Sequence, residues 1–241
     1  MIKFFRKIRQ NMIKENKASK YLLYAIGEIV LVVIGILIAI SINNWNENNK
    51  LAKKETTLLI SLQKEIEANI NILKFNIEYN SAIITATTNF LLDAKKKSST
   101  KSIANFKRTL AHGPSKIDAP ILDNILESNS RSFISNSKFI ELFRELKKAY
   151  NSIEKMEFYL DEFWNSKSAD FLIENELGNF FELDISNHDV KDKVLKLYSN
   201  EKFISVVSLK NLLHIDRLDT QESALIKSKE VLKILQNNIS K

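Results

Sequence analysis

The sequence predicts an all-α protein in which one N-terminal transmembrane helix is followed by an extended antiparallel helical bundle with coiled-coil-like long helices. Three observations carry this prediction. The stretch Tyr21–Ile42 is apolar except for one charged residue, Glu28. Turn formers are scarce, with 4 Gly and 2 Pro in 241 residues, whereas an all-β fold needs a turn about every 8–12 residues. Lys, Glu, Leu, Ile and Asn dominate long stretches that contain no helix breaker.

The apolar stretch divides the chain into three parts. We expect a basic cytoplasmic segment at residues 1–20, a transmembrane helix at 21–43 and an extracytoplasmic (periplasmic) helical domain at 44–241. At about 1.5 Å per residue, the apolar stretch is long enough to cross a hydrocarbon core of about 30 Å. A cleaved signal peptide is one alternative, but the run is longer than usual and Ala39-Ile40-Ser41 is a poor cleavage site. A buried core helix is the other, but apolar residues occupy every face.

Basic residues are concentrated in the N-terminal segment. Its seven Lys and Arg against one acidic residue, Glu15, give +6 of the chain's net +7, so the remainder carries +1. This location is typical of the cytoplasmic flank of a membrane span rather than of nucleic-acid binding. Apolar residues interleave with the basic ones, so the segment either lies on anionic lipid or serves only as a topology signal. The basic residues are Lys3, Arg6, Lys7, Arg9, Lys14, Lys17 and Lys20.

The flanks of the span predict its orientation. Seven basic residues precede it, whereas Lys50, Lys53 and Lys54 follow it, which favours a cytoplasmic N-terminus. Tyr21 and Tyr24 on one side and Trp45 on the other are expected to be interfacial anchors. The lipid bilayer is therefore the first expected partner.

Glu28 shares one helical face with two small residues, Gly35 and Ala39, and with Val32 and Ile42. Small residues let membrane helices approach closely, and a polar side chain can hydrogen-bond across the contact. We expect a helix-association seam that joins two copies of the chain, or the chain and another membrane protein. A proton relay, pairing with a partner's Lys or Arg, and a carboxylate that reaches the headgroups are the alternatives.

The first 47 residues contain four distinctive pieces: FFRKIR, the ENK-x-SKYLLYAIGEI run, the LVVIGILIA core and the INNWNE exit. In these pieces the segment resembles the opening of a domain-of-unknown-function family of single-pass membrane proteins from Gram-negative bacteria. The resemblance is looser over the body. It implies an inner-membrane protein with a helical extracytoplasmic region, and it transfers no catalytic residue.

Helical periodicity predicts the elements of the body. The longest are Glu47–Lys97, with a bend at Tyr79-Asn80-Ser81, then Lys138–Asn165 and Glu201–Ile239. Short helices are expected at Ser102–Ala111, Ala119–Ser128, Ser168–Glu176 and Asn187–Tyr198. Gly113 is expected to follow a helix end, and Asp118 to cap a helix whose first turn holds Pro120.

Apolar spacing predicts which face of each long helix is buried. In the first the seam is Leu59, Leu62, Ile66, Ile70, Leu73 and Ile77, continued more weakly by Ile84, Thr87, Leu91 and Lys95. In the second it is Phe139, Phe143, Leu146, Tyr150, Ile153, Leu160 and Trp164, with Met156 bridging a gap. In the third it is Val206, Leu213, Leu225, Leu232 and Ile239.

No pattern in the sequence predicts catalysis, so we expect that the protein is not an enzyme and binds no cofactor, metal or identified small-molecule substrate. The chain has no cysteine. His112, His188 and His214 look isolated, with His188 best explained by capping and dipole pairing beside Asp189 and Asp192. Phosphate loops, nucleophile elbows and HExxH are missing from the sequence.

Two classes of function remain. The first is a structural, interaction or scaffold component of the cell envelope. The second is a ligand-sensing or regulatory extracytoplasmic module that acts through a membrane partner, because the expected cytoplasmic part is only residues 1–20. A small transporter or proton channel would rest on Glu28 alone.

Overall fold

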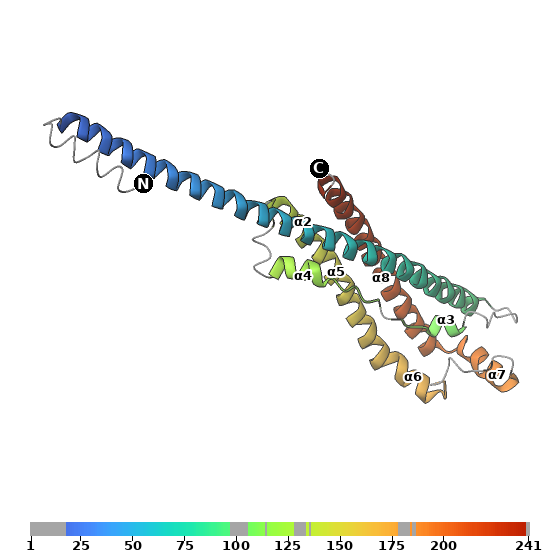
Figure 1. Cartoon of the computed structure of the whole chain (residues 1–241). Coiled ribbons are helices and arrows are strands. Elements are labelled where there is room, and N and C mark those ends of the chain that lie inside the picture. The colour runs from blue at the N-terminus through green and yellow to red at the C-terminus, as the bar shows by residue number, and fades with distance from the viewer. Residues whose placement is uncertain are drawn as a thin grey trace. The chain divides into compact units, whose positions relative to one another are not determined.

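The computed structural model describes residues 18–96, 106–113, 115–127, 134, 136–177, 184 and 187–239 (Figure 1). Throughout these residues the regular elements are helices, which confirms the all-α prediction. They are α2 (Ala18–Lys95), α3 (Phe106–Leu110), α4 (Pro120–Glu127), α5 (Ser137–Phe163), the π-helical turn η2 (Trp164–Ser168), α6 (Ala169–Glu174), α7 (His188–Leu197) and α8 (Glu201–Ile239).

The chain divides into two compact units, residues 1–54 and 55–241. In the first unit the described residues belong to α2, and one stretch of that helix is long and apolar enough to cross a membrane. Within that stretch the large apolar side chains are exposed, from Leu22 at 63% to Ile42 at 61%. The described part of this unit therefore buries none of its most apolar window.

In the second unit, α8 runs antiparallel to both α2 and α5. Asn80 of α2 contacts His214, whereas Glu67 of α2 contacts Gln236 near the end of α8. In the same way, α5 contacts α8 through Glu157–Arg217 at one level and Glu145–Lys227 at another. The α5–α8 pair is packed along much of its length (Figure 1).

The core of the second unit consists of two apolar clusters. The first joins α2, α4, α5 and α8 around fully buried Leu62, Leu122, Phe143 and Leu146. The second joins the end of α2 to α3, α6, α7 and the start of α8, around Phe90, Phe106, Phe171 and Phe203. The sequence correctly predicted Phe143 and Leu146 as core residues of α5.

The start of α7 follows a local rule, whereas the start of α4 does not. Asn187 accepts hydrogen bonds from the backbone N–H groups of Asp189 and Val190 and so caps α7 as expected. The exception is α4, where the predicted cap Asp118 instead pairs with Lys116 at 2.8 Å. Glu65 of α2 accepts from the backbone N–H groups of Ile121 (2.7 Å) and Leu122 (3.0 Å) in its place.

The predicted bend at Tyr79-Asn80-Ser81 is wrong, because α2 continues through it. The Ser81 hydroxyl donates to the carbonyl of Ile77 inside the helix, and the Asn80 amide is used in a contact with α8. Residues 36–112 also contain no Gly or Pro that would break the helix. Satisfied polar side chains therefore leave the helix intact at a sequence that favours turns.

Gly113 follows the end of α3 at Leu110, as expected, but it does so without a positive φ. Its importance is steric. A Cβ at this position would lie 2.8 Å from Cε1 of Tyr79. The missing side chain is what lets the α3–α4 connection lie close against α2.

Candidate functional site

Polar residues occupy the buried face of α8 in its middle. The face repeats every three or four residues, as in any helix packed along its length. Its members are Phe203, Val207, Lys210, His214, Arg217, Gln221, Ala224, Ser228, Val231 and Leu235. Apolar residues form the two ends, and four ionisable or amide side chains lie between them. Of the predicted face, Leu225 and Leu232 are half-buried and pack against the first apolar cluster, whereas Val206 and Leu213 are half-buried outside it. The side chain of Ile239 lies outside the described part of the chain.

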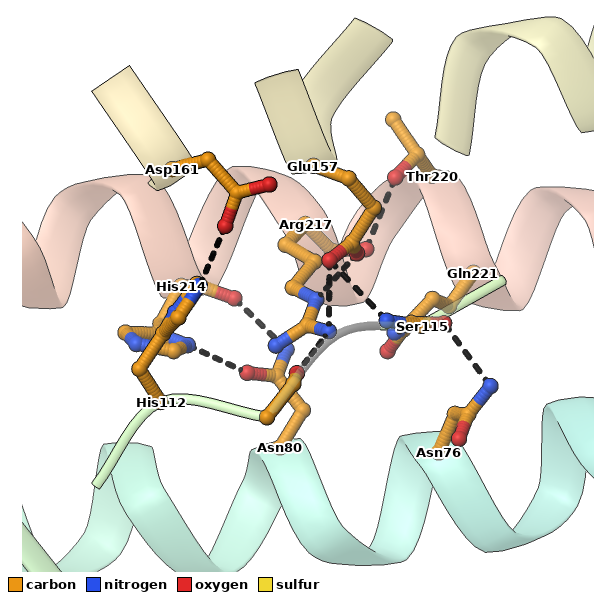
Figure 2. Close-up of polar contacts among 11 residues, drawn as sticks. Asn76, Asn80, His112, Ser115, Glu157, Asp161, His214, Arg217, Thr220 and Gln221 are labelled. Atoms are coloured by element: carbon orange, nitrogen blue, oxygen red, sulfur yellow. Dashed lines mark hydrogen bonds and ion pairs between the residues drawn. The ribbon is translucent and has the colours of Figure 1, made fainter. Parts of the chain in front are cut away.

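The other two long helices carry matching polar positions. In α2, half-buried Asn76 and buried Asn80 lie on the inner face between buried Leu73 and Ile83, where the sequence pattern led us to expect only apolar residues. In α5 the gap in the seam is filled by Glu157 rather than by Met156 alone. We call the resulting group the buried polar layer, and Figure 2 shows it without Lys210. Its members are Asn76, Asn80, His112, Gly113, Ser115, Glu157, Asp161, Lys210, His214, Arg217 and Gln221.

An ion pair between α5 and α8 lies at the centre of the layer. Arg217 donates from Nε to Oε1 of Glu157 (2.7 Å) and from Nη2 to Oε2 (3.0 Å), so the contact is bidentate. The Arg217 side chain is 1% exposed and that of Glu157 is 12% exposed. Burial raises the pKa of Glu157 above its usual value, and the Arg217 charge opposes that rise. Arg217 also donates to the carbonyl oxygen of Gly113.

His214 connects α8 to α2 through a reciprocal contact with Asn80. The Asn80 amide donates to the backbone carbonyl of His214 at 2.8 Å, and His214 Nδ1 lies 2.6 Å from Asn80 Oδ1. Burial, together with the charges of Lys210 and Arg217, lowers the pKa of His214 from 6.5 to about 2. The imidazole is therefore neutral at physiological pH, with Nδ1 as the donor to Asn80.

Lys210 caps the C-terminal end of α3. Its ammonium donates to the carbonyl oxygens of Thr109 (3.0 Å) and Ala111 (2.6 Å) at the C-terminal end of the helix. It also lies 5.1 Å from the centroid of the Trp164 ring, a cation–π distance. Burial lowers the pKa of Lys210 from 10.5 to about 7.

His112, which follows α3, contacts Trp164 and Asp161. Its ring stacks on Trp164 at 5.9 Å, and its Nε2 is 2.7 Å from Oδ1 of Asp161. Burial lowers the pKa of His112, while the hydrogen bond to Asp161 opposes that shift. His112 and His214 were predicted to be isolated, and the structure instead brings both into one layer. His188, in contrast, lies at the start of α7 beside Asp192, as expected.

Ser115 joins three helices through one short loop. Its backbone N–H donates to Glu157 at 3.0 Å, and its hydroxyl oxygen accepts from Asn76 (2.8 Å) and Gln221 (3.1 Å). The loop between α3 and α4 is therefore hydrogen-bonded to α2, α5 and α8 next to the ion pair (Figure 2).

A pocket of about 390 Å³ lies beside the layer and reaches two of its members, Ser115 and Glu157. Its other walls come from the loop before α4 and from α5, including Tyr150 and Glu154. Lys147 and Asp123, which are 2.7 Å apart, also line it. A ligand in this pocket would touch the residues that connect the helices.

The layer satisfies its hydrogen bonds incompletely within the described part of the chain. Atoms without a partner there are His112 Nδ1, His214 Nε2, Arg217 Nη1 and Gln221 Oε1. Buried polar groups are ordinarily hydrogen-bonded. Local conflicts of this kind are expected at functional or specificity-determining sites. Within the residues described, no group of three or more His, Asp or Glu side chains is placed to hold a metal ion.

The site residues predicted from the sequence lie elsewhere. Glu28 is half-buried, Ala39 is exposed, and a Cβ on Gly35 would meet no atom within 4 Å. Tyr24 and Trp45 are exposed, while the side chains of Lys20 and Tyr21 are outside the described part. Lys3, Arg6, Lys7, Arg9, Lys14 and Lys17 also lie outside the described residues. The signal that the sequence offered for the layer was the three-and-four spacing of polar residues along α8.

The fold and site define an all-α protein with one apolar helix of membrane-spanning length and a polar layer in its helical core. A family of unknown function, DUF6090, matches residues 28–111, which run from inside the apolar stretch to just beyond α3. This match agrees with the resemblance to a domain of unknown function. No curated protein and no solved structure matches the chain.

Proposed function

We propose that the protein is anchored in the bacterial inner membrane by residues 21–43 and acts as an interaction or scaffold component of the cell envelope. The observation that carries the proposal is the exposure of the large apolar side chains from Leu22 to Ile42. Contiguous exposed apolar surface of this extent marks contact with a membrane or another protein. The length of the stretch suits a bilayer core of about 30 Å.

The charge distribution supports a cytoplasmic N-terminus and a periplasmic C-terminal domain. Seven basic residues precede the span and three follow it closely, as the positive-inside rule favours. The N-terminal basic residues would face anionic lipid headgroups. The Gram-negative inner membrane is implied by the resemblance of residues 1–47 to the single-pass family.

Fractionation and topology reporters test the anchor. The full chain should stay with membranes after carbonate extraction. A periplasm-active reporter at Lys241 should be active, and a cytoplasm-active reporter before Lys3 should be fluorescent. Replacing Val30 and Ile34 by Lys should release the chain, since each charge at mid-span costs about 2.5–3.5 kcal/mol. Release of the unmodified chain by carbonate would contradict the anchor, and an active cytoplasmic reporter at Lys241 would reverse the topology.

The face of Glu28, Gly35 and Ala39 is the proposed contact with a second copy or another membrane protein. Gly35 offers space for close approach. Cysteines at positions 28, 32, 35 and 39 of this cysteine-free chain should crosslink in membranes more readily than cysteines at 30, 33 and 37. Equal crosslinking around the helix would leave no seam. Gly35→Leu should weaken the association by sterics alone.

A ligand-sensing module is the second candidate, and the pocket beside the buried polar layer is the observation that favours it. A small molecule in this pocket would contact Ser115 and Glu157, which are bonded to α2 and α8. A thermal-shift screen on the full chain in detergent tests it. A true ligand should raise the melting temperature, and Asn151→Trp, which fills the pocket, should abolish that rise. No stabilising compound across charged and neutral classes would count against sensing.

A further inference from the structure

The pocket beside the buried polar layer carries more negative than positive charge. Its walls hold four carboxylates and two ammonium groups. They are Asp118, Asp123, Glu154 and Glu157 on one side of the balance and Lys116 and Lys147 on the other. Its volume of about 390 Å³ lies in the range of about 300–1,000 Å³ that is usual for small-molecule sites. An occupant that brings positive charge would therefore suit this pocket.

Three of the four carboxylates of the pocket already have a basic partner. The pairs are Lys116–Asp118 (2.8 Å), Lys147–Asp123 (2.7 Å) and Arg217–Glu157 (2.7 Å). Even with Arg217 counted, the carboxylates outnumber the bases by one. Within the part of the chain that the structure describes, Glu154 is the pocket carboxylate that forms no ion pair. Its charge is therefore available to a bound cation.

Unused hydrogen-bond acceptors accompany this charge. Glu154 and Glu157 lie three residues apart on α5, so their side chains are neighbours on one face of that helix. Glu157 accepts two hydrogen bonds from Arg217 and one from the backbone N–H of Ser115, which leaves one of the about four acceptor positions of a carboxylate. Fully buried Gln221 donates to Ser115, and its own amide oxygen has no partner among the described residues. A ligand rich in donors would use these acceptors.

The arrangement fits an organic ammonium ion better than a metal ion. No three acidic or histidine side chains among the described residues are placed to hold one metal ion. An ammonium group has three N–H donors and no acceptor, so it can bind acceptors that stand apart. The pocket also has an apolar wall, formed by Ile117, Ala119 and Tyr150, which belong to the first apolar cluster or pack against it. This combination suits an amine with a short hydrocarbon chain.

We propose that the pocket binds the primary ammonium group of a small organic amine, with Glu154 as its counter-ion and Glu157 as a second acceptor. The hydrocarbon part of the amine lies against Ile117, Ala119 and Tyr150. This inference rests on the proposed sensing function, because it names the class of ligand for that same pocket. The bound ammonium shares Glu157 with the ion pair that joins α5 to α8, so binding reaches the contact between these two helices.

Four probes with the same hydrocarbon chain test the class of ligand. At pH 7 pentylamine is an ammonium ion, pentanol is neutral, pentanoate is an anion, and pentyltrimethylammonium is a cation without N–H donors. In calorimetric titrations of the full chain in uncharged detergent, pentylamine should bind, pentyltrimethylammonium more weakly, and pentanol and pentanoate not measurably. Tighter binding of pentanol or pentanoate than of pentylamine overturns the amine proposal. Equal binding of the two cations overturns the hydrogen-bonded ammonium.

Variants of α5 locate the binding site. Glu154→Gln removes the charge and keeps the size of the side chain, so it should weaken pentylamine binding by about tenfold or more. Glu141→Gln makes the same change at an exposed position of α5 outside the pocket and should leave binding unchanged. Asn151→Trp fills the pocket and should abolish binding. Undiminished binding by Glu154→Gln or by Asn151→Trp, each shown to be folded by circular dichroism, overturns the site.

The titrations and the broader thermal-shift screen separate the amine from sensing in general. If pentylamine does not bind but the screen finds a compound whose stabilising effect Asn151→Trp abolishes, the amine is overturned and the sensing function stands. If neither experiment finds a ligand, both are overturned. Binding of pentylamine that is lost in Glu154→Gln and kept in Glu141→Gln supports the amine site.

Discussion

His214 illustrates how burial makes one side chain sensitive to acid. The neutral ring is enclosed between α2 and α8, and its pKa falls to about 2, whereas a histidine in an unfolded chain titrates near 6.5. Below pH 6.5 the unfolded chain therefore takes up a proton that the folded chain does not. The contribution of His214 to stability is complete above pH 6.5 and is lost as the pH falls toward 2.

We predict that His214→Gln flattens this dependence. In the unmodified chain, His214 should lower the free energy of unfolding by at most about 1.4 kcal/mol for each pH unit below 6.5. Urea unfolding of both proteins at pH 7, 6 and 5 gives the difference, which isolates His214 from Glu157 and His112. Identical slopes in His214→Gln and the unmodified chain would contradict the prediction.

The Arg217–Glu157 pair is expected to add little net stability, because the cost of burying two charges offsets their attraction. Arg217→Met alone leaves a buried carboxylate without its partner and should cost about 3–5 kcal/mol of unfolding free energy. Arg217→Met with Glu157→Met replaces both charges by apolar side chains and should cost clearly less than the single change. A double-mutant cycle in urea measures this. Additive costs would show that the two residues do not act as a pair.

At the scale of the elements, α4 begins under the control of a residue far away in the sequence. Glu65 accepts two backbone N–H groups of its first turn, and burial raises the pKa of that carboxyl while those hydrogen bonds oppose the rise. Glu65→Ala should cost about 0.5–2 kcal/mol, in the range of lost helix caps. Asp118→Ala, at the cap position that the sequence favoured, should cost little because its side chain is exposed and paired to Lys116. Urea unfolding compares them, and the reverse order of costs would restore Asp118 as the cap.

Helix existence and bounds were largely predictable. The last helix spans Glu201–Ile239, as the unbroken run predicted, and α4, α5 and α7 lie within one or two residues of their predicted bounds. Long runs without Gly or Pro and local caps such as Asn187 contain this information. The Glu65 cap was unpredictable, because it joins positions more than fifty residues apart.

The buried faces were predictable only where they are apolar. Leu59 to Leu73 in α2 were assigned correctly, but beyond them the seam passes through Asn76 and Asn80. In α8 the apolar residues Val206 and Leu213 suggested a face that the structure leaves half-exposed. Hydrophobic periodicity identifies a core because burial is normally apolar. It fails where partner polar groups on other helices, unknown from the sequence, satisfy a buried charge.

At the scale of the whole second unit, the buried polar layer separates two apolar clusters. Phe203 packs against Phe90 (5.5 Å), Phe106 (6.2 Å) and Phe171 (5.1 Å) within one of them. We predict that Phe203→Ala, at a cost of about 3–5 kcal/mol, loosens that cluster preferentially. Amide hydrogen exchange should rise in α6, α7 and the start of α8 and stay slow in α4 and the first half of α5.

The matched variant in the other cluster is Leu62→Ala, since Leu62 is also fully buried. It should raise exchange in α4 and the first half of α5 and spare α7. Uniform acceleration by both variants would show that the clusters unfold as one cooperative unit.

The buried charged residues and exposed leucines in the middle of α8 also determine which substitutions the helix should accept. Along residues 209–217, positions that a hydropathy scale marks as core, such as Leu209 and Leu212, should admit charged residues in the isolated chain. Positions that it marks as surface, such as Lys210 and Arg217, should reject most replacements. A saturation library scored for folded protein would then show, over this stretch, a tolerance map opposite to the one that hydropathy predicts. Homologues that diverge by ordinary surface drift would keep their charged residues and vary their leucines.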